Sequence, residues 1–273
     1  MKNQEKSQTK HIGFEKLLLQ LSNHRYDIAD IFDDFMQWVI LGFCVDGSAE
    51  SSFLSKYKEK EINMFHDLFD ELATELQSHL GTNYEEVRCY DILGSIFEDY
   101  VTSRSRKDFR GQFFTPEHIC KLMGLMTMDG DKEGRLTDIA CGSGRMLLAG
   151  YELSKGQAIC FGSDIDKTCC LMTICNFLFH GITGEVVHQN TIINNYFDGW
   201  AINANIRNPF SKYFGVPHII RISQENSYIW NKTNQIFKNA ITEKNNTEKN
   251  KVTNKFYTQE ITTKNIETQA VLF

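Results

Sequence analysis

The stretch DIACGSG, residues 138–144, decides the fold class that this sequence predicts. The apolar run RLTDIA leads into two closely spaced glycines, and the helical pattern GRMLLAGYELSK begins at the second of them. Gly142 and Gly144 have no Cβ, so the backbone can approach a ligand where a side chain would collide. The first turn of a helix also offers unpaired N–H groups. We therefore predict a strand, a glycine turn and a helix that together form a ligand site.

Short apolar runs continue to alternate with helical patterns after this stretch. AICFGSD, GEVVHQN and GWAINANI are further candidate strands, HIIRI is a candidate fifth strand, and DKTCCLMTICNFLFHG is a second helix. Such alternation is typical of βαβ units in a parallel sheet, so we predict an α/β fold. The near-continuous apolar character of residues 171–179 predicts a helix that packs deeply on this sheet.

The part of the chain before the glycine turn has a different pattern. It contains no proline before Pro116, and apolar residues recur there at helical spacing over residues 28–40, 62–80 and 92–100. Residues 1–107 hold 12 Lys+Arg and 19 Asp+Glu. We predict an acidic all-α N-terminal domain over residues 1–107 and an α/β domain over residues 108–221. The tail, residues 222–273, is rich in Asn, Thr and Lys with scattered apolar residues. This composition is compatible with a disordered segment and with an ordered one, so both alternatives stay open.

Composition excludes several classes of protein. With 41% hydrophobic residues the chain is not wholly disordered, and no run of 18 apolar residues predicts a transmembrane helix. The segment MKNQEKSQTK has no apolar core, so we expect no signal peptide, no membrane partner and a cytoplasmic location. The eight cysteines form no CxxC pair, so we expect reduced thiols and no metal site. The net charge of −6 argues against binding nucleic acid by bulk charge but leaves room for a local basic site.

Two carboxylates follow the second apolar run. Asp164 ends this run, where a carboxylate can accept hydrogen bonds from both hydroxyls of a ribose. Asp166 is the competitor, and we assign it instead to the cap of the following helix. Leu147 stands where the dinucleotide fingerprint has its third glycine, which disfavours a nicotinamide or flavin cofactor.

The loop GQFFTP, residues 111–116, precedes the first strand. Thr115 suits a helix N-cap, Pro116 suits the first helical position, and Glu117 suits the positive end of the helix. Capping does not explain two adjacent phenylalanines in a polar loop. One of them is a candidate to cover an adenine ring.

GQFFTP, DIACGSGRM and FGSDID, in this order and spacing, resemble the adenine-N6 DNA methyltransferases of the type I restriction-modification class. The resemblance spans residues 90 to about 191 and includes DILGSIFEDYV and NFLFHGI. It implies a Rossmann-like, S-adenosylmethionine-dependent methyltransferase fold behind a helical N-terminal domain. It also implies a modification subunit that methylates N6 of adenine in duplex DNA, alone or with a specificity or restriction subunit.

The resemblance assigns the cofactor-binding residues by position. Residues that would flank S-adenosylmethionine are Phe113, Phe114 and Thr115. Its methionine end would lie at the turn formed by Asp138, Ala140, Gly142 and Gly144. Asp164 would bind its ribose, and Asn190 would approach its adenine.

The catalytic loop departs from the family. The family has Asn/Asp-Pro-Pro-Phe/Tyr after the fourth strand, where the polar residue accepts hydrogen bonds from the target amino group and the ring stacks on a flipped base. Here the candidate is Asn208, Pro209 and Phe210, with one proline missing. Asn203 or Asn205 at the strand end is an alternative, and a simple strand-ending turn is another.

A further departure is that the predicted sheet is shortened or diverged after the fourth strand. A basic cluster ahead of the cofactor loop is a candidate for contacts with DNA phosphates, and a solvated interdomain linker is the alternative: Arg104, Arg106, Lys107 and Arg110. Two other functions therefore stay open. One is a catalytically degenerate subunit that binds S-adenosylmethionine or assists assembly, and the other is an RNA or protein-amide N-methyltransferase.

Overall fold

The computed structural model describes residues 12–23, 25–80, 86–105, 113–128, 134–236 and 238–239. The chain divides into two compact units, Met1–Ile229 and Trp230–Phe273. The first contains all of the named helices and strands. In the second, residues 230–236 are helical, and Thr233 Oγ1 donates a hydrogen bond to the carbonyl of Trp230 at 3.0 Å.

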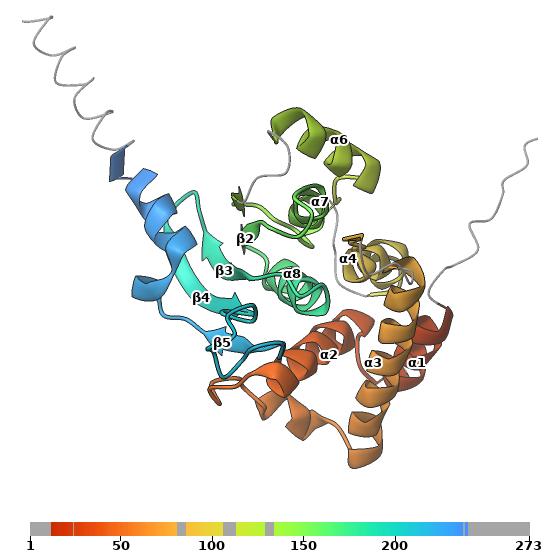
Figure 1. The fold of residues 1–273 in the computed structure, drawn as a ribbon. Coiled ribbons are helices and arrows are strands. Elements are labelled where there is room, and N and C mark those ends of the chain that lie inside the picture. Colours follow the sequence, from red (N-terminus) through yellow and green to blue (C-terminus); the bar gives the residue numbers. More distant parts are fainter. Residues whose placement is uncertain are drawn as a thin grey trace, which may run out of the picture. The chain divides into compact units, whose positions relative to one another are not determined.

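The N-terminal part is helical, as the apolar stripes predict (Figure 1). Its elements are α1 (Ile12–Ser22), α2 (Ile28–Phe43), the 3₁₀ turn η1 (Ser52–Lys56), α3 (Glu59–Leu80), α4 (Ile92–Ile96), the π-helical turn η2 (Phe97–Val101) and α5 (Thr102–Arg104). The stripe of α3 is buried at Phe65, Leu68, Leu72 and Leu76. None of the helices within the described ranges combines the length and apolar character that a membrane crossing requires.

All five expected strands form, in one sheet of order β1-β2-β3-β4-β5, although the fourth begins and ends four residues earlier than the run GWAINANI predicts. They are β1 (Arg135–Asp138), β2 (Ile159–Asp164), β3 (Gly184–Asn190), β4 (Asn195–Ile202) and β5 (Ile219–Arg221). The strands β1, β2 and β3 are parallel, so the predicted α/β methyltransferase-like fold is confirmed.

The expectation that the fourth strand is also parallel is wrong. β4 pairs antiparallel with β3, and β5 pairs antiparallel with β4. The physical reason is the length of the connection. Only residues 191–194 join β3 to β4, whereas a parallel crossover needs a dozen or more residues. The two strands therefore form a hairpin, and Asn194 in its turn has a positive φ of 53°.

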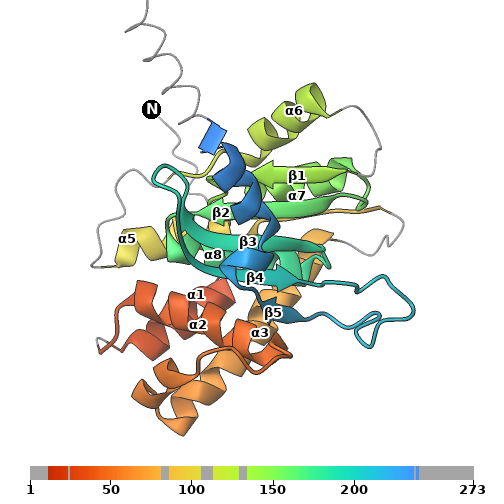
Figure 2. The same ribbon diagram turned by 90° about the vertical axis from the view of Figure 1, so that its left-hand side faces the viewer.

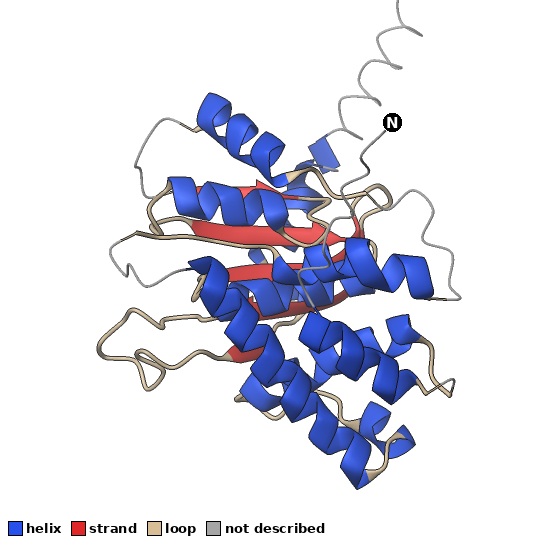
Figure 3. Ribbon diagram, turned by 90° about the vertical axis from the view of Figure 1, so that its right-hand side faces the viewer, coloured by secondary structure: helices blue, strands red, loops and turns tan. Residues whose placement is uncertain are grey.

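Helix α8 (Lys167–Phe179) lies between the sheet and the N-terminal helices (Figure 1). Figure 3 shows helices in front of the strands, on the side of the sheet that faces the viewer. Helix α8 contacts β2 and β3 on one side and α2 and α4 on the other. This double contact explains why every residue from Cys169 to Leu178 is buried. Asp166 caps its first turn as predicted, because the carboxylate accepts hydrogen bonds from the N–H groups of Thr168 and Cys169.

The helices α6 (Glu117–Thr127) and α7 (Arg145–Leu153) pack against each other, and α7 also contacts β1 and β2. One hydrophobic cluster runs from Phe14 in α1 to Ile219 in β5 and so includes both the helices and the sheet. The predicted domain boundary at residue 107 lies outside the described residues and stays a prediction.

The predicted tail begins with an ordered segment on the sheet. The short 3₁₀ turn η3 (Gln224–Asn226) leads into a helix that begins at Tyr228. Glu185 of β3 accepts hydrogen bonds from the N–H groups of Tyr228 and Ile229 at 2.9 and 3.0 Å, which caps this helix. The ring of Tyr228 lies 4.3 Å from that of Phe161 in β2, so the segment covers part of the sheet face.

The packing of α8 predicts a large cost for removing its side chains. Ile174→Ala should lower the free energy of unfolding by about 2–5 kcal/mol, because the site is fully buried between two layers. Urea denaturation followed by circular dichroism measures this. Leu125→Ala on α6 is the control, because Leu125 is 67% exposed and its loss should cost no more than about 0.5 kcal/mol. Equal losses in the two variants would contradict the central position of α8.

Candidate active site

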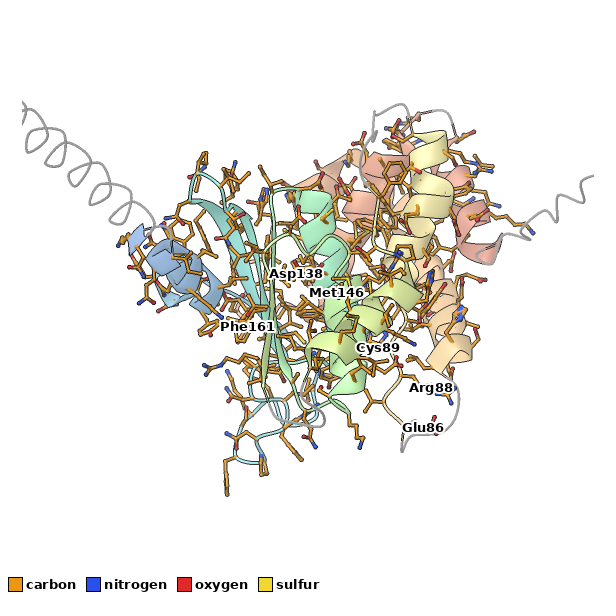
Figure 4. The ribbon with its side chains drawn as sticks, turned by 90° about the horizontal axis from the view of Figure 1, so that it is seen from above. Glu86, Arg88, Cys89, Asp138, Met146 and Phe161 are labelled. Carbon is orange, nitrogen blue, oxygen red and sulfur yellow. The ribbon has the colours of Figure 1, made fainter. Side chains whose placement is uncertain are left out.

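A hollow of about 430 Å³ lies at the carboxyl ends of β1 and β2. Three segments line it: the loop before α6, the glycine turn with the start of α7, and the turn from β2 into α8. Asp138 and Met146, labelled in Figure 4, belong to its wall. The size is in the usual range for a small-molecule site, and the carboxyl edge of parallel strands is where α/β folds bind ligands.

The glycine turn is shaped by close contacts. Gly142 and Gly144 both have positive φ angles, 55° and 85°, which side chains other than glycine rarely adopt. A Cβ on Gly142 would lie 2.9 Å from Cδ1 of Phe114, and one on Gly144 would lie 3.0 Å from Cγ2 of Thr173. The hydroxyl of Thr173 also donates to the carbonyl of Gly142 at 2.9 Å. The turn therefore needs glycine at both positions for conformation and for space.

Asp164 ties this turn to the end of β2. Its Oδ2 accepts a hydrogen bond from the N–H of Gly142 at 2.9 Å, and its Oδ1 accepts one from the N–H of Asp166 at 2.9 Å. A carboxylate offers about four lone-pair positions, so Asp164 keeps acceptor capacity toward the hollow. It thus supports the turn and remains able to bind hydroxyl groups of a ligand.

Asp138 is a second carboxylate in the same wall. Its Oδ1 accepts a hydrogen bond from the N–H of Ala140 at 3.1 Å. Burial raises the pKa of Asp138, and the negative charge of Asp164 raises that pKa further. A positively charged ligand group beside Asp138 would offset both effects.

The two phenylalanines occupy different environments. Phe114 is half-buried, and its ring lies 5.8 Å from that of Phe97 in η2. Phe113 is 88% exposed at the rim of the hollow. Phe114 is therefore held in place by the protein, whereas Phe113 has its ring free for a ligand or substrate.

The assignment of Thr115 as a helix cap is wrong. Helix α6 begins at Glu117, with Pro116 in the N-cap position and no capping hydrogen bond from a side chain. Pro116 has an extended backbone, with ψ at 143°, so the helix starts one residue later than predicted. Thr115 instead lines the hollow, and its carbonyl accepts a hydrogen bond from Arg145 Nη1 at 3.3 Å.

Three cysteine thiols, of Cys120, Cys141 and Cys169, also line the hollow. Burial raises the pKa of each, so the thiols stay protonated and poorly nucleophilic. The eight cysteines are free in the structure. Within the described ranges, no group of His, Cys, Asp and Glu side chains has the arrangement of a metal site.

Sequence reasoning missed a buried ionic network behind the hollow. Asp91, at the N-cap of α4, accepts hydrogen bonds from Gly94 N at 2.9 Å, Asn176 Nδ2 at 2.8 Å, Arg145 Nε at 2.7 Å and the hydroxyl of Ser143. These donors come from α4, α8 and the glycine turn with the start of α7. Asp91 belongs to DILGSIFEDYV, which was part of the sequence resemblance. Its partners Ser143, Arg145 and Asn176 lie more than 50 residues later in the chain, so no local sequence pattern could identify them.

Gly144 and Asn190 are the cofactor candidates that do not line the hollow. Gly144 acts through the conformation of the turn. Asn190 ends β3, and its Oδ1 accepts hydrogen bonds from the N–H groups of Ile192 and Ile193 at 3.1 and 3.3 Å. Its side chain thus organises the β3–β4 hairpin, and its assignment to the adenine of a cofactor stays a prediction.

The structure does not bring the proposed catalytic loop to this hollow. The end of β4 pairs with the beginning of β3, so the residues after Ile202 leave the sheet at the edge opposite the hollow. In Figure 2 the loop between β4 and β5 extends away from the sheet. Asn208 is exposed, and its Oδ1 accepts a hydrogen bond from the N–H of Phe210, whose side chain is 95% exposed. The catalytic assignment of Asn208, Pro209 and Phe210 stays a prediction that this placement does not support.

The alternative residues of that loop have their own positions. Asn203 is fully buried, with its Nδ2 donating to the carbonyls of Phe177 and Ile182 and its Oδ1 accepting from His218 N. It has a structural position with no access to a substrate. Asn205 is exposed and has a positive φ of 62°.

Of the basic cluster, only Arg104 falls in the part of the chain that the structure describes. It is exposed, and its guanidinium lies 4.1 Å from the centre of the Tyr100 ring. Arg106, Lys107 and Arg110 lie outside the described residues. The DNA-binding assignment of the cluster stays a prediction.

The α/β core with its glycine turn and paired carboxylates has the fold of S-adenosylmethionine-dependent methyltransferases. Residues 88–260 match the N-6 DNA Methylase family, which is more than half of the chain, so the chain belongs to this family.

Individual relatives share less than a third of their residues with this chain over the aligned regions. The chain is 29% identical over 119 residues to the type I restriction enzyme MjaVIII methylase subunit of Methanocaldococcus jannaschii, covering 41% of this chain and 20% of that protein. It is 26% identical over 103 residues to the MjaVII methylase subunit of the same organism, covering 35% of this chain and 17% of that protein. The matched regions thus span about a fifth of these relatives.

A crystal structure of a type I restriction-modification system methyltransferase subunit from Streptococcus thermophilus aligns with a TM-score of 0.32. Its sequence is 22% identical, and the alignment covers 62% of this chain and 36% of that one.

The raised pKa of Asp138 predicts a pH-dependent effect on stability. A folded pKa above the unfolded value of about 3.9 means that ionisation destabilises the fold as the pH rises through the folded pKa. Asp138→Asn should therefore raise the melting temperature at pH 7.5, with the gain shrinking toward pH 4. Asp67→Asn, on the exposed face of α3, is the control and should show no such trend. A lower melting temperature for Asp138→Asn at pH 7.5 would contradict the inference.

Proposed function

We propose that this chain binds S-adenosylmethionine in the hollow and serves methyl transfer to N6 of adenine in DNA, within a restriction-modification system. The observation that carries the proposal is that residues assigned to the cofactor by the sequence resemblance come together in the structure. All of them except Gly144 and Asn190 line one hollow at the carboxyl edge: Phe113, Phe114, Thr115, Asp138, Ala140, Gly142 and Asp164.

The hollow fits the proposed cofactor chemically. The absence of a side chain at Gly142 lets the glycine turn and the ring of Phe114 meet in one wall of the hollow, since a Cβ there would come within 2.9 Å of the ring. Asp138 offers a partly desolvated negative charge to a cationic ligand. Asp164 retains acceptor positions for ribose hydroxyls. The exposed ring of Phe113 is available to cover a base.

The bound cofactor supplies an already activated methyl group, so the protein mainly has to position the reactants. Asp138 and the glycine turn would hold the methionine end, and Asp164 would orient the ribose. Asn208 and the carbonyl of Pro209 would accept hydrogen bonds from the target amino group, and Phe210 would stack on the base. Those target-side groups lie across the sheet from the hollow, so transfer requires either a rearrangement of residues 203–218 or a partner that supplies the target-side loop.

A second candidate function is a subunit that binds the cofactor without performing transfer. The position of Asn208 at the opposite edge and the missing second proline favour it. An RNA or protein-amide methyltransferase has no such supporting observation.

The remaining parts of the methyltransferase proposal concern substrate, partner and location. They are duplex DNA as substrate, contact of the basic cluster with its phosphates, a specificity or restriction subunit as partner, and a cytoplasmic location.

The first test is cofactor binding by titration calorimetry on the full chain. S-adenosylmethionine should bind with a micromolar dissociation constant, which is a binding free energy of about −8 kcal/mol, and NADH should not bind. Asp164→Ala should weaken binding by about 1–3 kcal/mol, because charged hydrogen bonds to the ribose are lost. Asp166→Asn is the matched control, since asparagine preserves the helix cap and should preserve affinity. NADH binding without a response to S-adenosylmethionine would overturn the proposed cofactor.

The second test separates catalysis from binding alone. If residues 208–210 work as the catalytic loop, the chain should transfer labelled methyl groups to adenine in duplex DNA. Asn208→Ala should then abolish transfer with unchanged cofactor affinity, because the side chain acts only in the chemical step. Asn205→Gly, a neighbour in the same loop, should retain transfer. Transfer that survives Asn208→Ala would exclude this loop assignment, and a wild-type chain that binds the cofactor but transfers nothing would support the binding subunit.

A further inference from the structure

A carboxylate of the N-terminal part reaches into the wall of the hollow. Oε1 of Glu98 accepts a hydrogen bond from the N–H of Phe114 at 3.0 Å, and its Oε2 accepts one from Arg145 Nη2 at 2.8 Å. Glu98 thus holds the loop before α6 and the start of α7 at the same time. A second, longer hydrogen bond joins the same two segments, from Arg145 Nη1 to the carbonyl of Thr115 at 3.3 Å.

Arg145 completes the connection on the other side. Its Nε lies 2.7 Å from Asp91 Oδ2, and its guanidinium carbon lies 5.6 Å from the centre of the Phe114 ring. The side chains of Arg145 and Asp91 are only 11% and 3% exposed. Burying an ion pair costs desolvation that its attraction often only offsets, so such a pair is weak evidence for stabilisation. What this pair does provide is a single geometry for the ring of Phe114.

The backbone around Glu98 is irregular in a way that serves this contact. Glu98 lies in the π-helical turn Phe97–Val101, between α4 and α5. Single π-helical turns within α-helices occur frequently at functional sites because they redirect side chains. Here the same turn supplies the ring of Phe97 to one side of Phe114 and the carboxylate of Glu98 to its backbone N–H.

The ring of Phe114 passes this geometry to the ligand site. It lies against Gly142, where even a single Cβ would come within 2.9 Å of the ring. Any displacement of Phe114 therefore changes the wall next to the glycine turn.

We infer that Glu98 and Arg145 are positioning residues for the cofactor hollow and act through Phe114. The inference rests on the proposed function, because the ligand used to test it is S-adenosylmethionine. It assigns to the helical N-terminal part an indirect role in ligand affinity, since Glu98 and Asp91 both come from that part of the chain.

The experiment is a double-mutant cycle on the full chain, with the dissociation constant of S-adenosylmethionine measured by calorimetry. Glu98→Gln keeps one acceptor oxygen and so cannot satisfy both Phe114 N and Arg145. It should weaken binding by about tenfold, which corresponds to about 1.4 kcal/mol. Phe114→Ala should also weaken binding, and the double variant should bind no more weakly than Phe114→Ala alone, because the ring that Glu98 positions is gone.

Glu86→Gln is the matched control. Glu86 forms an exposed ion pair with Arg88, with Oε2 and Nη2 2.7 Å apart, and both residues lie well apart from Asp138 in Figure 4. This variant should leave the dissociation constant within about twofold of wild type, as expected for an exposed pair. Replacement of Glu98 leaves Arg145 paired with Asp91, so no buried charge loses its last partner, and Glu98→Asp repeats the cycle with the negative charge retained.

The outcomes distinguish the two levels of the argument. A wild-type chain that does not bind S-adenosylmethionine overturns the proposed function and this inference with it. Normal binding by wild type and by Glu98→Gln overturns only the positioning role. Additive losses in the double variant also overturn it, since they would show that Glu98 acts on the fold in general and not through Phe114.

Discussion

The buried carboxylate of Asp91 is the interaction on which the rest of the structure depends. It accepts hydrogen bonds from Gly94, Ser143, Arg145 and Asn176, so one residue joins the N-terminal helices, the glycine turn, the start of α7 and the middle of α8. A buried charge is stable only when its hydrogen-bonding capacity is satisfied, and each donor is therefore held in place by the others. The position of the glycine turn therefore depends on this network as well as on the residues of the turn itself.

The same constraint explains why the helical part and the sheet share one hydrophobic cluster. Helix α8 has no solvent-facing side between Cys169 and Leu178, because α2 and α4 cover the side that the sheet leaves open. The helices and the ligand site are consequently one packed body, and a carboxylate such as Glu98 can act on the hollow from outside the α/β core. The hollow combines a glycine turn, carboxylates and aromatic rings in one wall.

The target side is different, and the reason is the topology of the sheet. A parallel β4 would have delivered the following loop to the edge where Asp138 and Asp164 lie. The hairpin between β3 and β4 reverses that direction, so Asn208 emerges at the far edge. The residues proposed to bind the cofactor and those proposed to bind the target base therefore lie at opposite edges of the sheet, so binding and transfer need separate measurements.

Sequence alone predicted the helices, the strands and most of the residues that line the hollow, because these depend on local patterns. Helical stripes, five apolar runs and the spacing of Gly142, Asp138 and Asp164 are readable without knowledge of the fold. Only the tertiary structure decided which residues meet across the chain. Asp91 and Arg145 are far apart in sequence, and their pairing follows from how α4 packs on α8 beside the glycine turn. The direction of β4 also depends on the tertiary structure. Residues 191–194 are too few for a parallel crossover, but only the pairing of β4 with β3 shows at which edge of the sheet Asn208 lies.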